Sequence, residues 1–194
     1  AVKFPEFHNG PVPSFGNLNS RILIVGLAPG LKGANRTARP FTGDYAGDLL
    51  YPTLRKFGFS RGTYNAHPND GIELIDCRIT SAVRCVPPQN KPVGAEVVAC
   101  RSFFESELFM LPNLKIVMAL GGLAHKATLA TLGYTQSAFK FVHTAMHEIE
   151  VDRRPLLLAN SYHCSRYNTN TGRLTTEMFE DVFTIVREHL DQLD

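Results

Sequence analysis

The stretch "RILIVGLAPGLKGANRTARPFTGD", residues 21–44, combines a strand signal with an unusually long loop. Its first part, Arg21–Leu27, is an apolar run typical of a buried strand. The loop that follows carries glycines, two prolines, three cations and, at its end, the carboxylate of Asp44. A plain connection between strand and helix takes only about two to six residues. We therefore expect this loop to enclose a ligand.

The rest of the chain repeats the alternation of strand and helix. Three more apolar runs predict strands, at Leu74–Val83, Leu114–Leu120 and Leu156–Asn160. Apolar residues at steps of three and four, with capping residues, predict helices over Ala46–Phe57, Gly94–Leu108, Gly122–Gly133 and Thr175–Leu190. Strands without polar alternation indicate a parallel sheet covered on both faces. Residues 1–194 are thus expected to form one α/β domain, with Phe59–Gly71 as an exposed loop.

Composition narrows the classes of function. The chain has 194 residues, of which 44% are hydrophobic, and a net charge of only +2. No apolar run reaches the ~18–20 residues of a membrane span, and no secretion leader is visible. Binding to nucleic acid would have to depend on local clusters of cations. Seven cations fall in the loops after the predicted strands: Lys32, Arg36, Arg39, Arg84, Lys91, Arg166 and Arg173.

Ligands of parallel sheets bind outside the carboxyl ends of the strands. Three of the predicted strands lead into unusual loops there, which read "GLAPG…FTGD", "RCVPPQNKP" and "SYHCSRYNTNTGR". The sequence therefore predicts one site at that edge. Neither the Walker pattern nor the dinucleotide pattern of glycines is present, which disfavours nucleotide hydrolysis.

Within these loops, three side chains could carry chemistry. Asp44 precedes a predicted helix, where Asp is also a common N-cap. His163 follows a buried strand and could equally be a structural histidine. Phe41 lies in a polar loop, where we expect it to be exposed and to suit a flat heteroaromatic ligand. Cys164 is adjacent to His163, but neighbours on an extended backbone point to opposite sides, so a Cys–His nucleophile is disfavoured.

Together, "GLAPGLKGANRTARPFTGD", "SAVRCVPPQNKP" and "SYHCSRYNTNTGRLT" resemble the motifs of the iron–sulfur uracil-DNA glycosylases, in particular the family-5 or B-type branch. The resemblance extends from about Pro11 to the C-terminus. It implies a three-layer αβα sandwich around a four-stranded parallel sheet. It also implies hydrolysis of the N-glycosidic bond of uracil in DNA, which starts base excision repair.

The resemblance assigns roles to particular residues. Asp44 and His163 would be catalytic, and Phe41 would stack on the flipped base. The other predicted base-pocket residues are Gly26, Ala28, Gly30, Ser81, Asn90 and Asn168. The predicted DNA contacts are Lys32, Arg36, Arg39, Ser165, Arg166 and Arg173. Ser81 stands where a sister branch has a uracil-reading Asn, so deaminated or damaged bases besides uracil are expected substrates.

The family binds a four-iron, four-sulfur cluster through four cysteines. Cys85 and Cys100 match the second pair of ligands, whereas the N-terminal C-x-x-C pair is absent from these residues. Our interpretation is that an N-terminal cluster-binding segment is missing, the alternative being a chain that has lost its cluster. If Cys77–Cys85 is extended, Cys77 lies too far away to replace a ligand.

Two other classes of function stay open from the sequence. The chain could be a catalytically silent protein that binds DNA lesions, or a nucleotide-binding α/β protein unrelated to DNA. We expect a monomer that contacts DNA but no membrane, in the prokaryotic cytoplasm with the nucleoid.

Overall fold

The computed structural model describes residues 4–88 and 92–193. Its centre is a mixed sheet of six strands in the order β1-β5-β2-β6-β8-β7. The strands are β1 (Phe15–Gly16), β2 (Ile22–Gly26), β5 (Cys77–Ser81), β6 (Ile116–Leu120), β7 (Met146–Val151) and β8 (Arg154–Ser161). The four central strands are parallel, as expected, and β1 and β7 add antiparallel edges.

The edge strand β7 is absent from the sequence-based prediction. Its residues alternate between exposed and buried, with Glu148 and Glu150 facing solvent and Ile149 and Val151 buried. This is the pattern of an antiparallel strand that faces water on one side. The continuous apolar runs that revealed the central strands do not occur in β7.

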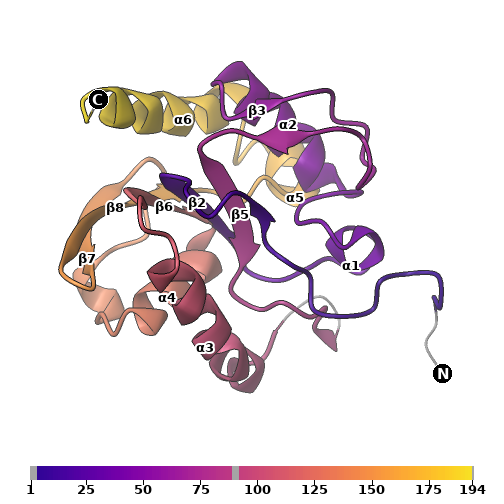
Figure 1. Cartoon of the computed structure of the whole chain (residues 1–194), viewed down its shortest axis with the longest axis horizontal. Coiled ribbons are helices and arrows are strands. Elements are labelled where there is room, and N and C mark those ends of the chain that lie inside the picture. Colours follow the sequence, from indigo (N-terminus) through magenta and orange to yellow (C-terminus); the bar gives the residue numbers. More distant parts are fainter. Residues whose placement is uncertain (1–3, 89–91, 194) are drawn as a thin grey trace.

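Helices cover both faces of the sheet, which confirms the α/β sandwich (Figure 1). The longer helices are α2 (Tyr45–Lys56), α3 (Gly94–Phe109), α4 (Gly122–Thr131) and α6 (Thr176–Asp191), each within two residues of an expected boundary. The shorter α1 (Ala34–Thr37), the 3₁₀ turn η2 (Gln136–Ala138) and α5 (Arg166–Asn170) were not predicted from the sequence. Both α1 and α5 follow strands whose carboxyl ends lie at the predicted site edge.

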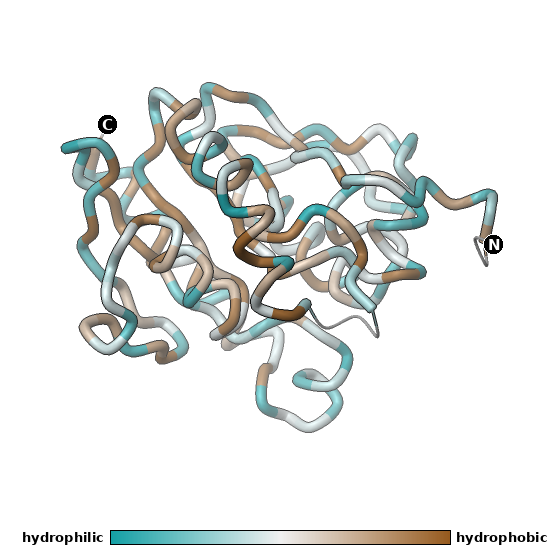
Figure 2. Tube along the Cα trace, turned by 90° about the horizontal axis from the view of Figure 1, so that it is seen from below, coloured by the Kyte–Doolittle hydropathy of each residue, from teal (hydrophilic) through white to brown (hydrophobic). Residues whose placement is uncertain are grey.

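Alternate residues of each central strand enter two separate cores. Ile24 and Met118 pack with Leu50 of α2 and Phe183 of α6, and their strand neighbours pack with Leu108 of α3 on the opposite face. This follows from the two-residue period of strand side chains. Figure 2 shows hydrophobic segments through the middle of the molecule and hydrophilic segments in the outer turns. Among the described residues, no helix is long and apolar enough to cross a membrane.

The segment Phe59–Gly71 is more ordered than the exposed loop expected from its composition. Phe59 is fully buried, and β3 (Ser60–Arg61) pairs with β4 (Glu73–Leu74) in a second, two-stranded sheet. The pairing joins the two ends of this segment. Next to it, Phe59 packs on Phe183 of α6. The expectation of an exposed loop is therefore wrong for Phe59 and Ser60, which are buried, and is confirmed from Arg61 to Gly71, where most residues are exposed.

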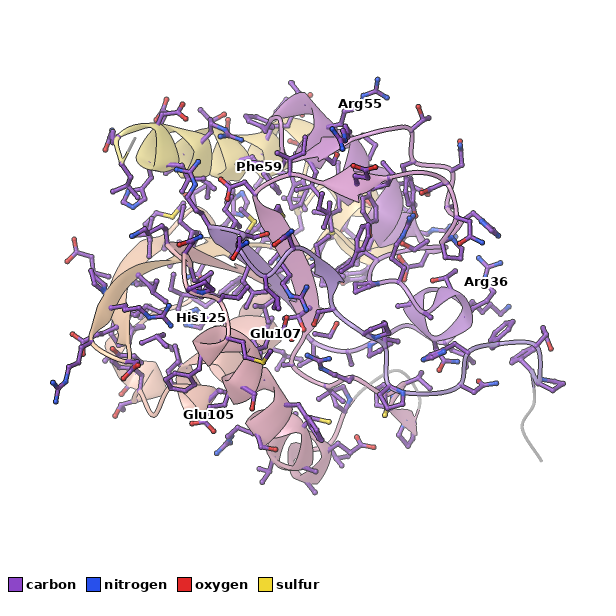
Figure 3. The ribbon with its side chains drawn as sticks, in the orientation of Figure 1. Arg36, Arg55, Phe59, Glu105, Glu107 and His125 are labelled. Atoms are coloured by element: carbon purple, nitrogen blue, oxygen red, sulfur yellow. The ribbon has the colours of Figure 1, made fainter. Side chains whose placement is uncertain are left out.

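A buried carboxylate on α3 removes one cation from the predicted rim. Glu107 points from α3 toward the sheet (Figure 3), where Arg78 and Arg84 form ion pairs with it. The Ser14 hydroxyl also donates to Glu107, at 2.9 Å. Arg84 thus ties the end of β5 to α3 instead of extending toward solvent.

Candidate functional site

The loop from Gly26 to Asp44 folds back over the carboxyl end of the sheet through three left-handed residues. Ala38 has a φ of 59°, Phe41 of 52° and Gly43 of 87°. Positive φ is rare for residues with a side chain and persists where the surroundings enforce it. The last part of this loop therefore has a defined path that brings Phe41 and Asp44 to the site.

The first and last of the three loops and the end of β5 meet around one cavity of about 310 Å³, a size typical of small-molecule sites. Phe41 and Asp44 come from the first loop, Ser81 from the end of β5, and His163 from the segment after β8. The complete lining is Leu27, Ala28, Pro29, Gly30, Ala34, Phe41, Asp44, Ala46, Ser81 and His163. The convergence expected from the sequence is confirmed for the first and last loops, whereas the described residues of the second loop, 84–88 and 92, do not line this cavity.

Phe41 is less exposed than the sequence suggested. Its side chain packs into the core beside α2 and is only 8% exposed, although it lines the cavity. Gly26 makes this position possible, because a Cβ there would lie 2.8 Å from the Phe41 ring. Gly26 is therefore not a lining residue. It provides the space that the aromatic wall occupies.

Asp44 occupies the N-cap position of α2, but its side chain makes no capping hydrogen bond. Its Oδ1 is buried without a hydrogen-bond partner among the described residues. A Cβ on Gly33 would lie 2.1 Å from Oδ2, so the loop is shaped around this carboxylate. Burial raises the pKa of Asp44, and the amides of Gly47 and Ala46 offset this only in part.

His163 also lines the cavity and lies two residues after β8. Its ring centroid is 5.9 Å from that of Phe41, at an angle of 35°. Burial lowers the pKa of His163, so its imidazole is neutral at pH 7. Neither ring nitrogen has a hydrogen bond within residues 4–88 and 92–193, which leaves a donor and an acceptor for a ligand.

Asn168 supports the His163 segment from α5. Its side-chain amide donates to the His163 carbonyl at 2.8 Å, and its own backbone N–H is capped by the Ser165 hydroxyl. Asn168 does not line the 310 Å³ cavity; it lines an adjoining one of about 260 Å³, which also includes His163. Asn90 lies outside the described residues.

Four of the predicted DNA contacts are exposed cations around the site: Lys32, Arg36, Arg166 and Arg173. Arg36 projects outward from α1 (Figure 3). The Arg166 guanidinium lies 5.3 Å from the Tyr45 ring, and that of Arg173 lies 4.8 Å from the Tyr162 ring. Lys91 is outside the described residues. These cations could contact phosphates along one side of the cavity.

Arg39 is a correction to the predicted DNA surface. It is only 5% exposed, and its guanidinium makes a bidentate ion pair with Asp70, with N–O distances of 2.7 and 2.8 Å. Its Nε also donates to the Thr42 hydroxyl, at 2.8 Å. Because these partners occupy the guanidinium, Arg39 joins the first loop to the Phe59–Gly71 segment instead of reaching solvent.

Replacing Asp70 with Asn is expected to lower the free energy of unfolding at pH 7 by about 3–5 kcal/mol, because Arg39 would become an unpaired buried cation. Burial alone would raise the pKa of Asp70. Hydrogen bonds from Arg39 and from the amides of Asn65 and Ile72 nevertheless hold this pKa well below its usual range. The carboxylate therefore contributes stability above the unfolded pKa of 3.8, and this contribution is lost as the pH falls further.

Urea denaturation of the two proteins measures this prediction. The difference between wild type and Asp70→Asn should be full at pH 7 and should shrink once the pH falls below about 4. Equal stabilities at pH 7 would show that the pair contributes nothing net.

The four cysteines fall into two environments. Cys77 and Cys164 are fully buried, and burial raises the pKa of both thiols, so neither is a nucleophile. Cys85 is exposed and Cys100 is partly buried on α3, and both are free thiols. A four-iron cluster needs four thiolates, whereas no group of three or more metal-binding side chains occurs in the described parts of the chain. These residues alone therefore do not complete a cluster site.

Comparisons with known proteins agree with the geometry. The family model of the "Uracil DNA glycosylase superfamily" matches residues 13–187. A Type-5 uracil-DNA glycosylase of Thermus thermophilus is 49% identical over 172 residues, 89% of this chain and 77% of the relative. The Type-5 enzyme of Pyrobaculum aerophilum is 43% identical, with 89% and 73% covered. A Type-4 uracil-DNA glycosylase of Sulfurisphaera tokodaii is 26% identical over 183 residues, 93% and 76% of the two chains.

Proposed function

Because the chain belongs to the uracil DNA glycosylase superfamily, we propose that its cavity receives a base flipped out of DNA and that Asp44 and His163 cleave the bond to the sugar. The protein is a uracil-DNA glycosylase, a hydrolase of DNA repair. One observation supports this use of the cavity above all others: Phe41, Asp44 and His163, from loops far apart in sequence, line the same space.

In the proposed mechanism, binding first extracts the base. Unstacking costs a few kcal/mol, and contact of the base with the Phe41 ring offsets part of it. Phe41 is suited to this role because its ring is held by the core on one side and borders the cavity on the other. The aromatic wall therefore stays in place whether or not a base is bound.

Cleavage of the N-glycosidic bond then separates charge. The sugar becomes an oxocarbenium-like cation, as in other glycoside hydrolyses. The Asp44 carboxylate, which lines the cavity, stabilises that cation and orients the attacking water. Negative charge moves onto the departing uracil, where the neutral imidazole of His163 donates a hydrogen bond. The two groups thus stabilise opposite charges on the two sides of the breaking bond.

DNA contacts are proposed for the exposed rim. Lys32, Arg36, Arg166 and Arg173 would pair with phosphates, and Ser165 would lie beside them at the start of α5. Tyr167, which is 71% exposed on α5, could enter the stack next to the extruded base. The monomeric state and the location with the nucleoid stay predictions.

A broader range of bases is proposed from Ser81. A hydroxyl rotates and can donate or accept, whereas an Asn side chain presents one fixed donor and one fixed acceptor. Ser81 therefore does not require one fixed order of hydrogen-bond donors and acceptors on the edge of the base that enters the cavity. Deaminated bases other than uracil fit this environment.

An iron–sulfur cluster also stays a proposal. Cys85 and Cys100 would supply two of its thiolates, and the remaining ligands are not among the described residues. Such a cluster would clamp the segment after β5 onto α3, which is a structural role.

The basic test is incubation of the protein with a uracil-containing duplex, followed by alkali, which breaks the strand at an abasic site. Strand scission that depends on the uracil is the expected result. Tight binding without scission would instead indicate a silent lesion-binding protein. Absence of any DNA binding at moderate salt would point to an unrelated nucleotide-binding protein.

The rate of uracil release is expected to fall as the pH is lowered below neutrality. The midpoint of this fall should lie at a higher pH than the ordinary Asp pKa of 3.8. Asp44 acts as a carboxylate, and burial raises the pKa at which that carboxylate is lost. Single-turnover rates between about pH 4 and pH 8 measure this fall. A rate that stays constant down to about pH 4 would contradict the assignment of Asp44.

A further inference from the structure

The end of the first loop is held by a residue that does not line the cavity. Phe41 has a φ of 52°, which a residue with a side chain rarely adopts, so the turn between the aromatic wall and Asp44 is not a conformation that the backbone favours by itself at Phe41. The hydroxyl of Tyr64 lies against this turn. It accepts a hydrogen bond from the Gly43 N–H at 3.2 Å and donates one to the Phe41 carbonyl at 3.3 Å.

This close approach depends on the absence of a side chain at Gly47. A Cβ there would lie 2.3 Å from the Tyr64 hydroxyl and 2.0 Å from the Phe41 carbonyl oxygen. Burial raises the pKa of Tyr64, so its hydroxyl keeps the proton that it donates. A single hydroxyl therefore bridges the residue that forms the aromatic wall and the residue before Asp44.

Tyr64 is itself fixed from two directions. Its ring stacks on Tyr51 of α2, with centroids 4.6 Å apart and an angle of 15°, and the Tyr51 hydroxyl donates to the Pro40 carbonyl at 2.7 Å. On the other side, Asp70 accepts from the Asn65 N–H at 3.0 Å while it pairs with Arg39. The segment that presents Tyr64 is thus tied to the same loop that Tyr64 holds.

We propose that Tyr64 is a positioning residue for uracil excision, which sets the Phe41 ring and the Asp44 carboxylate in the cavity through the Phe41–Gly43 backbone. This rests on the proposed function of the cavity. The Tyr64 hydroxyl acts only through the main chain, because Tyr64 is not among the residues that line the 310 Å³ cavity. Its loss should change the rate of the chemical step more than the binding of DNA.

Tyr64→Phe tests the proposal, because it removes the hydroxyl and keeps the stacked ring. Misplacement of a reacting group by about 1 Å can cost ~10²-fold in rate. We therefore expect the single-turnover rate of uracil release to fall about 10- to 100-fold. The dissociation constant for a duplex with an uncleavable uracil analogue should change less than about threefold, because the residues that touch DNA are unchanged.

Tyr134→Phe is the matched control. The Tyr134 hydroxyl also accepts from one backbone N–H and donates to one carbonyl, both of Glu150 on β7, at 2.8 and 3.2 Å. Its loss should leave the rate of uracil release unchanged. The melting temperatures of the two variants then show how much stability is lost when an equivalent pair of hydrogen bonds is removed at the site and away from it.

Two results would overturn the proposal. One is a single-turnover rate of Tyr64→Phe equal to that of wild type. The other is a rate loss that matches a general loss of folded protein in the melting curve. A wild-type protein inert on uracil-containing DNA would instead contradict the proposed function, so the two failures are distinguishable.

Discussion

Asp44→Asn is expected to reduce the single-turnover rate of uracil release by at least about 10²–10³-fold, the loss that follows removal of one preorganised electrostatic group. The carboxylate is the only charged group that lines the 310 Å³ cavity within the described residues. Asn has nearly the same shape as the Asp44 side chain but lacks the negative charge that faces the cationic sugar. The ground state has no such cation, so the binding of substrate should be preserved.

Single-turnover assays with enzyme in excess measure this effect, and binding to a duplex with an uncleavable analogue measures affinity. Asp48→Asn is the matched control, because Asp48 is an exposed carboxylate in the first turn of the same helix and does not line this cavity. It should leave the rate unchanged. A wild-type rate for Asp44→Asn would contradict a catalytic role for this carboxylate.

His163→Leu is expected to lower the same rate by about 10²–10³-fold, because the imidazole donor would no longer face the anionic uracil as it departs. His163→Gln should retain part of the activity, since a side-chain amide can still donate. Because burial lowers the pKa of His163, the imidazole is neutral above that lowered value. The loss should therefore be the same across neutral and mildly alkaline pH.

The control for His163 is His147→Leu. His147 lies on β7, where its Nε2 is 2.9 Å from the Lys140 carbonyl oxygen, and it does not line the cavity. Its replacement should not change uracil release. If His163→Leu excised uracil as fast as wild type, the departing base would have to be stabilised by backbone groups of the cavity instead.

The central fold could be predicted from the sequence because burial on both faces leaves a local signal. Ile22, Ile24 and Ile116 occupy continuous apolar runs, and helices such as α6 show spacings of three and four. β7 lacks such a continuous run because one of its faces is exposed; its signal is the alternation from Glu148 to Val151, and it pairs with the next strand, β8. The β3–β4 pair has only two residues in each strand, which is too short to leave a periodic pattern.

The site could be predicted in part for a related reason. Asp44, Phe41 and His163 fall in loops after parallel strands, so topology alone brings them to one edge. The position of each side chain depended on residues that carry no motif. The missing side chains of Gly26 and Gly33 leave space for Phe41 and Asp44, respectively. Neither close approach can be recognised in the sequence.

Arg39 and Tyr64 show where reading the sequence was insufficient. Arg39 belongs to a basic loop and was expected at the DNA surface, yet it is buried against Asp70, thirty-one positions along the chain. Tyr64 lies in a segment with the composition of a solvated loop, yet its hydroxyl bonds to the Phe41 carbonyl and the Gly43 N–H in the turn before Asp44. Charge and polarity indicate what a side chain can do, and only its neighbours decide which partner it meets.

By itself, the sequence determined the α/β architecture, the edge of the sheet that carries the site, and the residue types available there for glycosidic chemistry. These follow from periodicity and chain order, which are local properties. Only the tertiary structure decided that one oxygen of Asp44 is buried without a partner among the described residues, that burial lowers the pKa of His163, and that Arg39 is internal. These properties depend on desolvation and on long-range partners, and both arise when distant segments pack together.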